Sequence, residues 1–165
     1  MKSVKLKYSL EHSWIELKRK VVTIGITDYL LSELGDLIDL SLPKVGEEML
    51  TGISYGEIES ISVLHDLIAP IDGEIVKVNS DLVNSLGILQ KDPFGNGWFM
   101  KVRIAQPEQL DNLMDEEEYD EYKRSIKREE KEDGKRKIKV GRKRIIKSKS
   151  RSKTKSKGRS KKKRK

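Results

Sequence analysis

The segment from Glu57 to Asp66 carries side chains that could take part in proton transfer. Glu57 and Glu59 are two residues apart, so on a strand their carboxylates would lie on one face, and paired carboxylates can perform acid–base catalysis. His65 directly precedes Asp66. A single histidine without a second ligand or a nucleophile does not make a catalytic or metal site. We therefore interpret the two glutamates as part of a solvated strand face and His65 as a polar turn residue with an exposed ring.

Composition and motifs exclude several classes of function. The 165 residues contain no cysteine, which excludes disulfides, thiol catalysis and zinc–thiolate sites. The turn Gly95-Asn96-Gly97 is followed neither by Lys-Ser or Lys-Thr nor by a helix pattern, so it lacks the features of a phosphate-binding loop. No run of about 18 apolar residues could span a membrane, and the N-terminus lacks the apolar stretch of a signal peptide. We expect a cytoplasmic protein that makes no membrane contact.

Residues 8–105 alternate between short stretches rich in β-branched side chains and groups of turn residues. This pattern is typical of a β sandwich or a flattened barrel. Thr27 or Asp28 would cap a short helix that Gly35 ends, and residues 62–65 are a predicted turn. The predicted strands cover residues 14–17, 21–26, 38–42, 54–61, 66–70, 71–78 and 98–104.

The character of the chain changes after Pro107. Leucine and tyrosine side chains at spacings near three and four predict one or two amphipathic helices between residues 108 and 126. From about residue 127 the chain is almost purely charged, and it cannot bury enough apolar surface to offset an ordering cost on the order of 1–2 kcal/mol per residue. We predict a folded domain over residues 1–126 and a tail over residues 127–165 that is disordered or at most transiently helical.

The tail carries most of the positive charge. From Lys135 to Lys165 there are 19 Lys/Arg and no Asp/Glu, which leaves 16 basic and 27 acidic residues before it, so the overall +8 divides into +19 and −11. Such a tail would contact phosphates without sequence preference, but it has no aromatic side chain to stack on bases. The sequence leaves four possibilities for the tail. It could bind nucleic acid, bind an acidic partner, remain solvated, or fold back on the acidic part of its own chain. The candidate contact residues are Lys161, Lys162, Lys163, Arg164 and Lys165.

Several stretches of the sequence resemble the glycine cleavage H-protein family in both order and spacing. Each stretch is weak alone, but together they cover roughly residues 8–122 without an evident insertion or deletion, which makes the resemblance specific. The stretches are Tyr8–Trp14, Val22–Tyr29, Leu34–Asp36, Leu42–Gly46, Ala69–Ile75 and Asp92–Trp98.

This resemblance implies a mainly β fold, a lipoyl/biotinyl-type hybrid barrel of two small antiparallel sheets with a short helix near residues 28–34 and a C-terminal helical extension. It also implies a carrier and not an enzyme. In the family, a lipoyl group on an exposed hairpin lysine takes the aminomethyl group of glycine from glycine decarboxylase to the aminomethyltransferase, and dihydrolipoyl dehydrogenase reoxidises it. Such an arm works because it keeps the intermediate at a high effective concentration for successive partners.

The sequence departs from the family at the residue that would carry the cofactor. Where the family reads Glu-Ser-Val-Lys, this chain reads Glu-Ser-Ile-Ser over residues 59–62. Lipoate is attached through an amide, which requires a primary amine, and no lysine lies between Lys44 and Lys77. We therefore expect Ser62 to be unmodified and the chain to be a non-carrier scaffold, competitor or regulator. The alternative is a protein that binds nucleic acid or an acidic partner through its tail.

The residues on either side of Ser62 keep the family pattern. By resemblance, Gly56, Glu59 and Gly73 are expected to belong to the surface that the lipoylating enzyme and the partner proteins recognise. His12 also matches a family position. Such a position is compatible with lining the surface that meets the arm, but a structural role is the interpretation that we place first.

Overall fold

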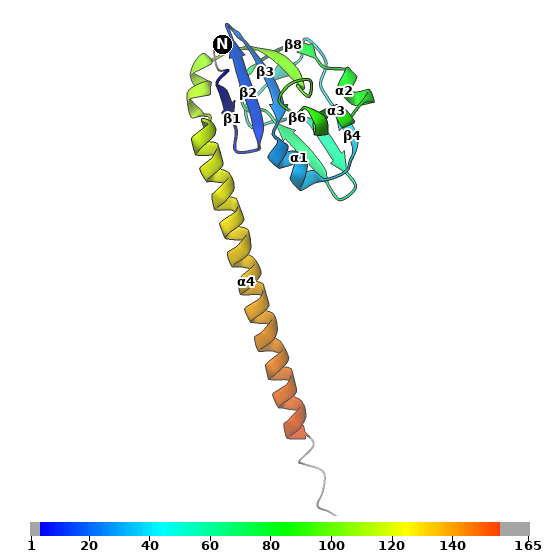
Figure 1. Cartoon of the computed structure of the whole chain (residues 1–165), viewed down its shortest axis with the longest axis vertical. Coiled ribbons are helices and arrows are strands. Elements are labelled where there is room, and N and C mark those ends of the chain that lie inside the picture. Colours follow the sequence, from blue (N-terminus) through cyan, green and yellow to red (C-terminus); the bar gives the residue numbers. More distant parts are fainter. Residues whose placement is uncertain (1–3, 156–165) are drawn as a thin grey trace, which may run out of the picture. The chain divides into compact units, whose positions relative to one another are not determined.

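The computed structural model describes residues 4–155, including the side chains of residues 4–137. A first unit ends at Tyr119 and contains two antiparallel sheets (Figure 1). Within the described residues, a six-stranded sheet has the order β1 (Leu6–Tyr8), β2 (Ser13–Lys18), β3 (Val21–Ile26), β9 (Met100–Ile104), β8 (Gly73–Val78) and β5 (Glu48–Met49). In the same part of the chain, a three-stranded sheet has the order β4 (Leu37–Ser41), β6 (Ser54–Ser60) and β7 (Leu64–Ile68).

The short helix α1 (Asp28–Leu34) confirms the predicted caps. Thr27 Oγ1 accepts a hydrogen bond from the amide of Leu30 at 3.3 Å, which satisfies one of the free donors at a helix start. Gly35 ends the helix at φ 75°, a conformation that favours glycine. Helices α2 (Asp81–Asn84) and α3 (Gly87–Lys91) lie in a segment for which the sequence pattern predicts no helix. The 3₁₀ helix η1 (Pro107–Asn112) overlaps the start of the predicted helical region.

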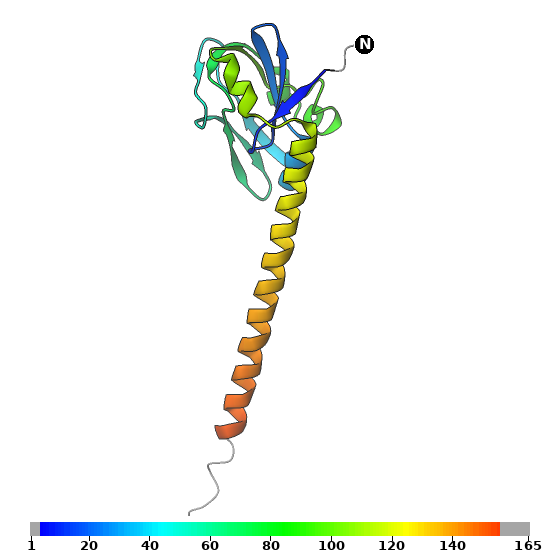
Figure 2. The same ribbon diagram turned by 90° about the vertical axis from the view of Figure 1, so that its left-hand side faces the viewer.

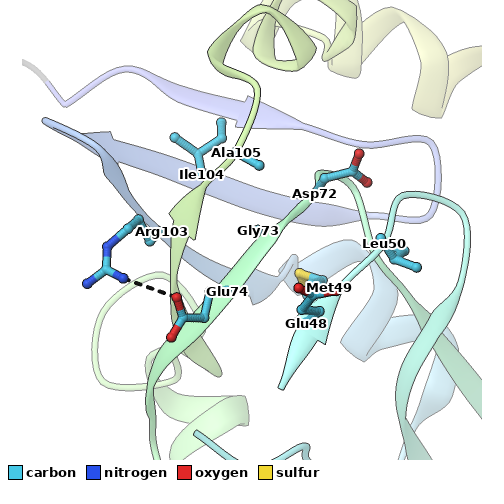
Figure 3. A pocket seen from close by; sticks show the side chains of 9 residues that line it. All are labelled: Glu48, Met49, Leu50, Asp72, Gly73, Glu74, Arg103, Ile104 and Ala105. Carbon is cyan, nitrogen blue, oxygen red and sulfur yellow. Dashed lines mark hydrogen bonds and ion pairs between the residues drawn. The ribbon is translucent and has the colours of Figure 1, made fainter. Parts of the chain in front are cut away.

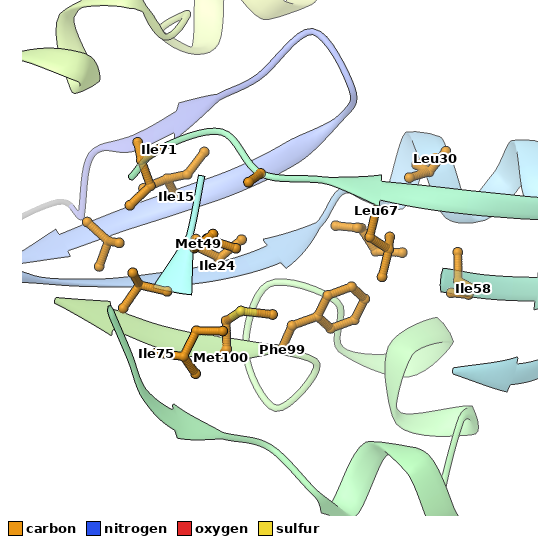
Figure 4. Packing of buried hydrophobic residues seen from close by; sticks show 14 of the residues in the cluster. Ile15, Ile24, Leu30, Met49, Ile58, Leu67, Ile71, Ile75, Phe99 and Met100 are labelled. Carbon is orange, nitrogen blue, oxygen red and sulfur yellow. The ribbon is translucent and has the colours of Figure 1, made fainter. Parts of the chain in front are cut away.

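Side chains from both sheets and from α1 share one apolar core (Figure 4). Along β3, Val22 and Ile24 are fully buried while Thr23 between them is half-buried, as expected where alternate residues of a strand face the core. Ile58 of β6 and Phe99 before β9 are fully buried in the same cluster. Removing this apolar surface from water is the main stabilising contribution, and the arrangement confirms the predicted mainly β fold with two antiparallel sheets.

Helix α4 (Glu116–Lys155) begins with a reciprocal capping arrangement. The amide of Asp115 donates to Glu118 Oε2 at 2.9 Å, and the amide of Glu118 donates to Asp115 Oδ1 at 2.9 Å. Each side chain thus satisfies a backbone donor that the first helical turn leaves free. The acidic residues Glu116 and Glu117 in that turn also interact favourably with the helix dipole.

The helix continues through residues 127–155, where the sequence predicted disorder or transient helix. Lysine, arginine and glutamate are good helix formers. Oppositely charged pairs one turn apart, such as Arg136 Nη1 with Asp133 Oδ1 at 4.0 Å, add to the stability of a helix at exposed positions. Residues 156–165, which include the candidate contacts at 161–165, lie outside the described residues.

Two glycines allow neighbouring strands to approach closely. A Cβ built on Gly73 would collide with the carbonyl oxygen of Arg103 on β9 and would lie 2.6 Å from Val102 Cγ1. A Cβ on Gly56 would collide with the carbonyl oxygen of Ser41 on β4. Backbone atoms cannot move aside as a flexible side chain can, so both positions require glycine for packing.

We predict that Gly73→Ala lowers the free energy of unfolding by about 1–3 kcal/mol, because the new methyl group forces β8 and β9 apart. Gly87→Ala is the matched control, since nothing lies within 4 Å of a Cβ at that position and alanine favours a helix more than glycine does. Urea denaturation of the two variants and the wild type measures the difference. Equal stabilities for the two variants would contradict this account of Gly73.

Candidate functional site

Ser62 lies in the turn between β6 and β7. This hairpin extends at the same end of the first unit as α1 (Figure 1; Figure 2). The predicted turn at residues 62–65 is wrong at its C-terminal end, because Leu64 already pairs with Glu59 and begins β7. The amide of Ile61 donates to the carbonyl of Asp36 at 3.0 Å. This bond attaches the tip to the connection between α1 and β4. Ser62 itself is exposed.

The buried hydroxyl of Ser60 organises the turn. Its Oγ accepts from the amide of Val63 at 3.1 Å and from the amide of Ser62 at 3.3 Å. The amide of Ser60 donates to the carbonyl of Val63 at 2.8 Å. A serine that bonds backbone groups two and three residues ahead is a recognised turn former, and this local signal could have identified Ser60 from the sequence. The turn is thus held without any contribution from the Ser62 side chain.

The outer face of the three-stranded sheet is acidic. The register sets Asp39 opposite Glu59, and Glu57 opposite Asp66. All four side chains are exposed, and within the described residues none of them forms an ion pair. Glu57 and Glu59 therefore do share one face beside the tip, as the sequence predicted. They form a solvated acidic surface without a nucleophile.

His65 and Asp66 do not form a catalytic pair. His65 lies opposite Ile58, which is fully buried, and in the same cross-strand row as Leu40. Successive residues of a strand point to opposite faces, so the His65 ring points inward and is half-buried while Asp66 points to solvent. The prediction of an exposed turn histidine is wrong in position, because β7 begins one residue before it.

Gly56 and Glu59 are on β6, the strand that leads into the hairpin tip. Gly73 begins β8, which belongs to the other sheet. The structure therefore brings only two of the three flanking candidates to the hairpin. Gly73 instead lines a shallow hollow of about 390 Å³ between β5, β8 and β9 (Figure 3).

Three of the four charged side chains that line this hollow, Asp72, Glu74 and Arg103, are engaged in structural contacts. Arg103 Nη1 donates to Glu74 Oε2 at 3.1 Å. Asp72 Oδ1 accepts from the amide of Thr51 at 2.7 Å, and its Oδ2 accepts from Gln109 Nε2 at 3.0 Å. The hydrogen bonds from Thr51, and secondarily that from Gln109, lower the pKa of Asp72. We assign no chemistry to the hollow.

His12 belongs to a buried polar network. Its Nδ1 lies 2.9 Å from the hydroxyl of Tyr119, and that hydroxyl lies 2.9 Å from Thr27 Oγ1, the cap of α1. The Tyr119 ring stacks on Tyr8 with ring centroids 4.5 Å apart. Burial raises the pKa of Tyr119 to about 12, although the hydrogen bond with Thr27 partly opposes the shift. These contacts give His12 the structural role that the sequence predicted.

Two further observations limit the functional possibilities of residues 4–155. None of the described groups of histidine, aspartate and glutamate side chains is arranged to hold a metal ion. No helix in this part of the chain is both long and apolar enough to cross a membrane.

Comparison with known proteins identifies the family. A family model described as glycine cleavage H-protein matches residues 6–126. The chain belongs to this family. It is 42% identical over 115 residues to a glycine cleavage system H protein from Carboxydothermus hydrogenoformans, covering 70% of this chain and 88% of the relative. It is 43% identical over 114 residues to another from Synechococcus sp., covering 69% and 88%.

The fold agrees with the same family. The crystal structure of a glycine cleavage system H protein from Mycobacterium marinum is similar to this chain with a TM-score of 0.62 and 35% identity, covering 69% of this chain and 92% of that one. Family members carry a lipoyl group between glycine decarboxylase, the aminomethyltransferase and dihydrolipoyl dehydrogenase, and have no catalytic activity of their own. The chain therefore belongs to a family of carrier proteins and is not an enzyme.

The Tyr119 network predicts a pH dependence. An unfolded tyrosine ionises near pH 10 and the folded Tyr119 near pH 12, so the folded state favours the neutral phenol. This contribution to stability is complete below about pH 10 and is lost as the pH rises towards 12. In Tyr119→Phe, the free energy of unfolding should fall less steeply over that window.

Chemical denaturation of both proteins between pH 9 and about 12 measures the two slopes. Tyr55, whose pKa burial also raises, is present in both proteins and cancels in the comparison. Identical slopes would show that the Tyr119 hydroxyl is not protected as the structure indicates.

Proposed function

We propose that this chain is a member of the H-protein family that does not carry lipoate and acts by binding partners of the glycine cleavage system, as a scaffold, competitor or regulator. The observation that carries the proposal is the side chain at the hairpin tip. Ser62 stands where the family has its modified lysine, and a hydroxyl cannot form the amide through which lipoate is attached. The residues of the tip therefore do not fit the family's cofactor.

No neighbouring lysine replaces the missing amine. The nearest lysines along the chain are Lys44 and Lys77, and both lie outside the β6–β7 hairpin. Lys77 is on β8, where its Nζ lies 5.6 Å from the ring centroid of Trp98, a cation–π contact. These positions support the view that lipoate has no attachment point on this hairpin.

The proposed partner-binding body covers residues 1–126, and residues 127–165 form an appendage with a separate role. The end of the family match at residue 126 supports this boundary. The exposed carboxylates of β4, β6 and β7 are the part of the body that we expect partners to contact first, because charge complementarity raises association rates.

Expression of the protein with lipoate and a lipoyl ligase tests whether the chain can be lipoylated. We predict that the wild-type chain gains no lipoyl mass, whereas Ser62→Lys gains one lipoyl group, because the turn is held by Ser60 and does not depend on the residue at 62. Intact-mass spectrometry reads both results, and a lysine-bearing family member in the same cells is the positive control. A lipoyl adduct on the wild-type chain overturns the proposal.

A second candidate function rests on the charge of the tail. The run of 19 Lys/Arg without an acid between Lys135 and Lys165 favours binding to nucleic acid or to an acidic partner through counterion release. In this case the tail would make the functional contact, and the H-protein-like domain would be a folded domain attached to it without a contact of its own.

Deletion of residues 127–165 tests this function. We predict that the full chain binds duplex DNA in a strongly salt-dependent manner and that the deletion removes this binding, because the remaining body has a net excess of acidic residues. Fluorescence anisotropy at several salt concentrations measures the affinity. If the truncated chain binds as tightly as the full chain, the tail is not responsible.

A further inference from the structure

Large apolar side chains are exposed at the hairpin tip and on the adjacent strand β4. The exposed fractions are 71% for Ile61, 45% for Val63, 58% for Leu64 and 55% for Ile38 of β4. Single exposed apolar residues are common on protein surfaces. A group of them at one place commonly marks a site of interaction.

The strand register places Leu64 on β7 and Ile38 on β4, on either side of the end of β6, which leads into the turn that carries Ile61, Ser62 and Val63. Leu64 lies opposite Glu59 on the outer face, and Glu59 lies opposite Asp39. Ile38 precedes Asp39 at an irregularity in the β4 pairing. Directly opposed residues of antiparallel strands are about 5 Å apart, so Leu64 and the residues around Asp39 belong to one surface. We call the four side chains at positions 38, 61, 63 and 64 the tip patch.

The tip patch is fixed in shape. The amide of Ile61 is bound to the carbonyl of Asp36 at 3.0 Å. The buried Ser60 hydroxyl holds the backbone of Ser62 and Val63. A partner would therefore order little backbone when it binds, which reduces the entropic cost of association.

The rim of the tip patch is acidic. Asp39, Glu57, Glu59 and Asp66 are exposed on the same sheet, and within the described residues none of them has an ion-pair partner. The sequence contains no lysine or arginine between Lys44 and Lys77. This combination disfavours anionic membranes and nucleic acid. It also disfavours a second copy of the tip, because like charges would face each other.

We propose that the tip patch binds a protein segment that carries aliphatic side chains together with lysine or arginine. The aliphatic groups would cover Ile61 and Leu64, and the cations would pair with Asp39 and Glu59. The inference rests on the proposed function, because a lipoyl arm on residue 62 would extend over the same surface. The hairpin then acts through noncovalent contact where the rest of the family uses a covalent arm.

The experiment uses the full chain and a fluorescein-labelled synthetic peptide of alternating leucine and lysine. In fluorescence anisotropy, Ile61→Ser combined with Leu64→Ser should weaken binding at least tenfold. The matched control is Leu17→Ser combined with Val83→Ser, which changes two side chains that are each 45% exposed on β2 and α2. This control should stay within twofold of the wild type. Circular dichroism and thermal melting verify that all variants fold.

A second pair of variants tests the charge. Asp39→Asn with Glu59→Gln should weaken binding at least fivefold. Glu108→Gln with Asp111→Asn, at exposed positions of η1, should have little effect. A peptide of alternating leucine and glutamate should not bind. Backbone amide shifts at residues 60–64 on peptide addition provide a readout that does not depend on any variant.

Several results would overturn the proposal. These are absence of peptide binding, equal binding by the tip variant and its control, and equal binding of the acidic peptide. Concentration-dependent self-association that the tip variant abolishes would identify a second copy as the occupant and would also overturn it. The lipoyl mass of the wild-type chain is measured separately. Failure of the peptide experiment therefore leaves the proposed function standing, and a lipoyl adduct counts against both.

Discussion

The register of β6 between β4 and β7 is the constraint on which the hairpin depends. Ile58 is fully buried and lies opposite Leu40 on one side and His65 on the other. A slip by one residue would expose Ile58 and turn Glu57 and Glu59 into the core. Burial of the Ile58 side chain thus fixes the register in which Glu57 and Glu59 face solvent. The same register leaves Ser62 in the turn at the end of the hairpin.

The fold and the carrier chemistry of this family depend on different atoms. The turn is held by the hydroxyl of Ser60 and by backbone hydrogen bonds, and residue 62, which is exposed, contributes only its backbone amide to them. The hairpin can therefore keep its shape when the residue at its tip changes. Membership of the family therefore establishes the fold of this chain. Its activity depends on the residues at the hairpin tip.

Several residues that we expect, by resemblance, to follow the family pattern have a sufficient explanation in packing. Gly56 and Gly73 are required where a neighbouring backbone carbonyl leaves no space for a Cβ. His12 joins Tyr119 and Thr27 in a network that connects the cap of α1 to the first turn of α4. A match to the family at such positions indicates the same packing and does not by itself indicate that a partner is recognised there.

The sequence by itself determined the properties that depend on residue type and on near neighbours. It predicted the capped helix α1, most of the strands, the division of charge and the absence of an amine at Ser62. It missed the short strands β1 and β5 and placed the end of the turn two residues late, because a pairing partner decides whether a residue such as Leu64 belongs to a strand. Only the tertiary structure decided which side chains meet across the chain. Ile38 lies beside the tip, Tyr119 meets His12, and Gly73 lies against β9, because these contacts form when distant segments bury their apolar faces together.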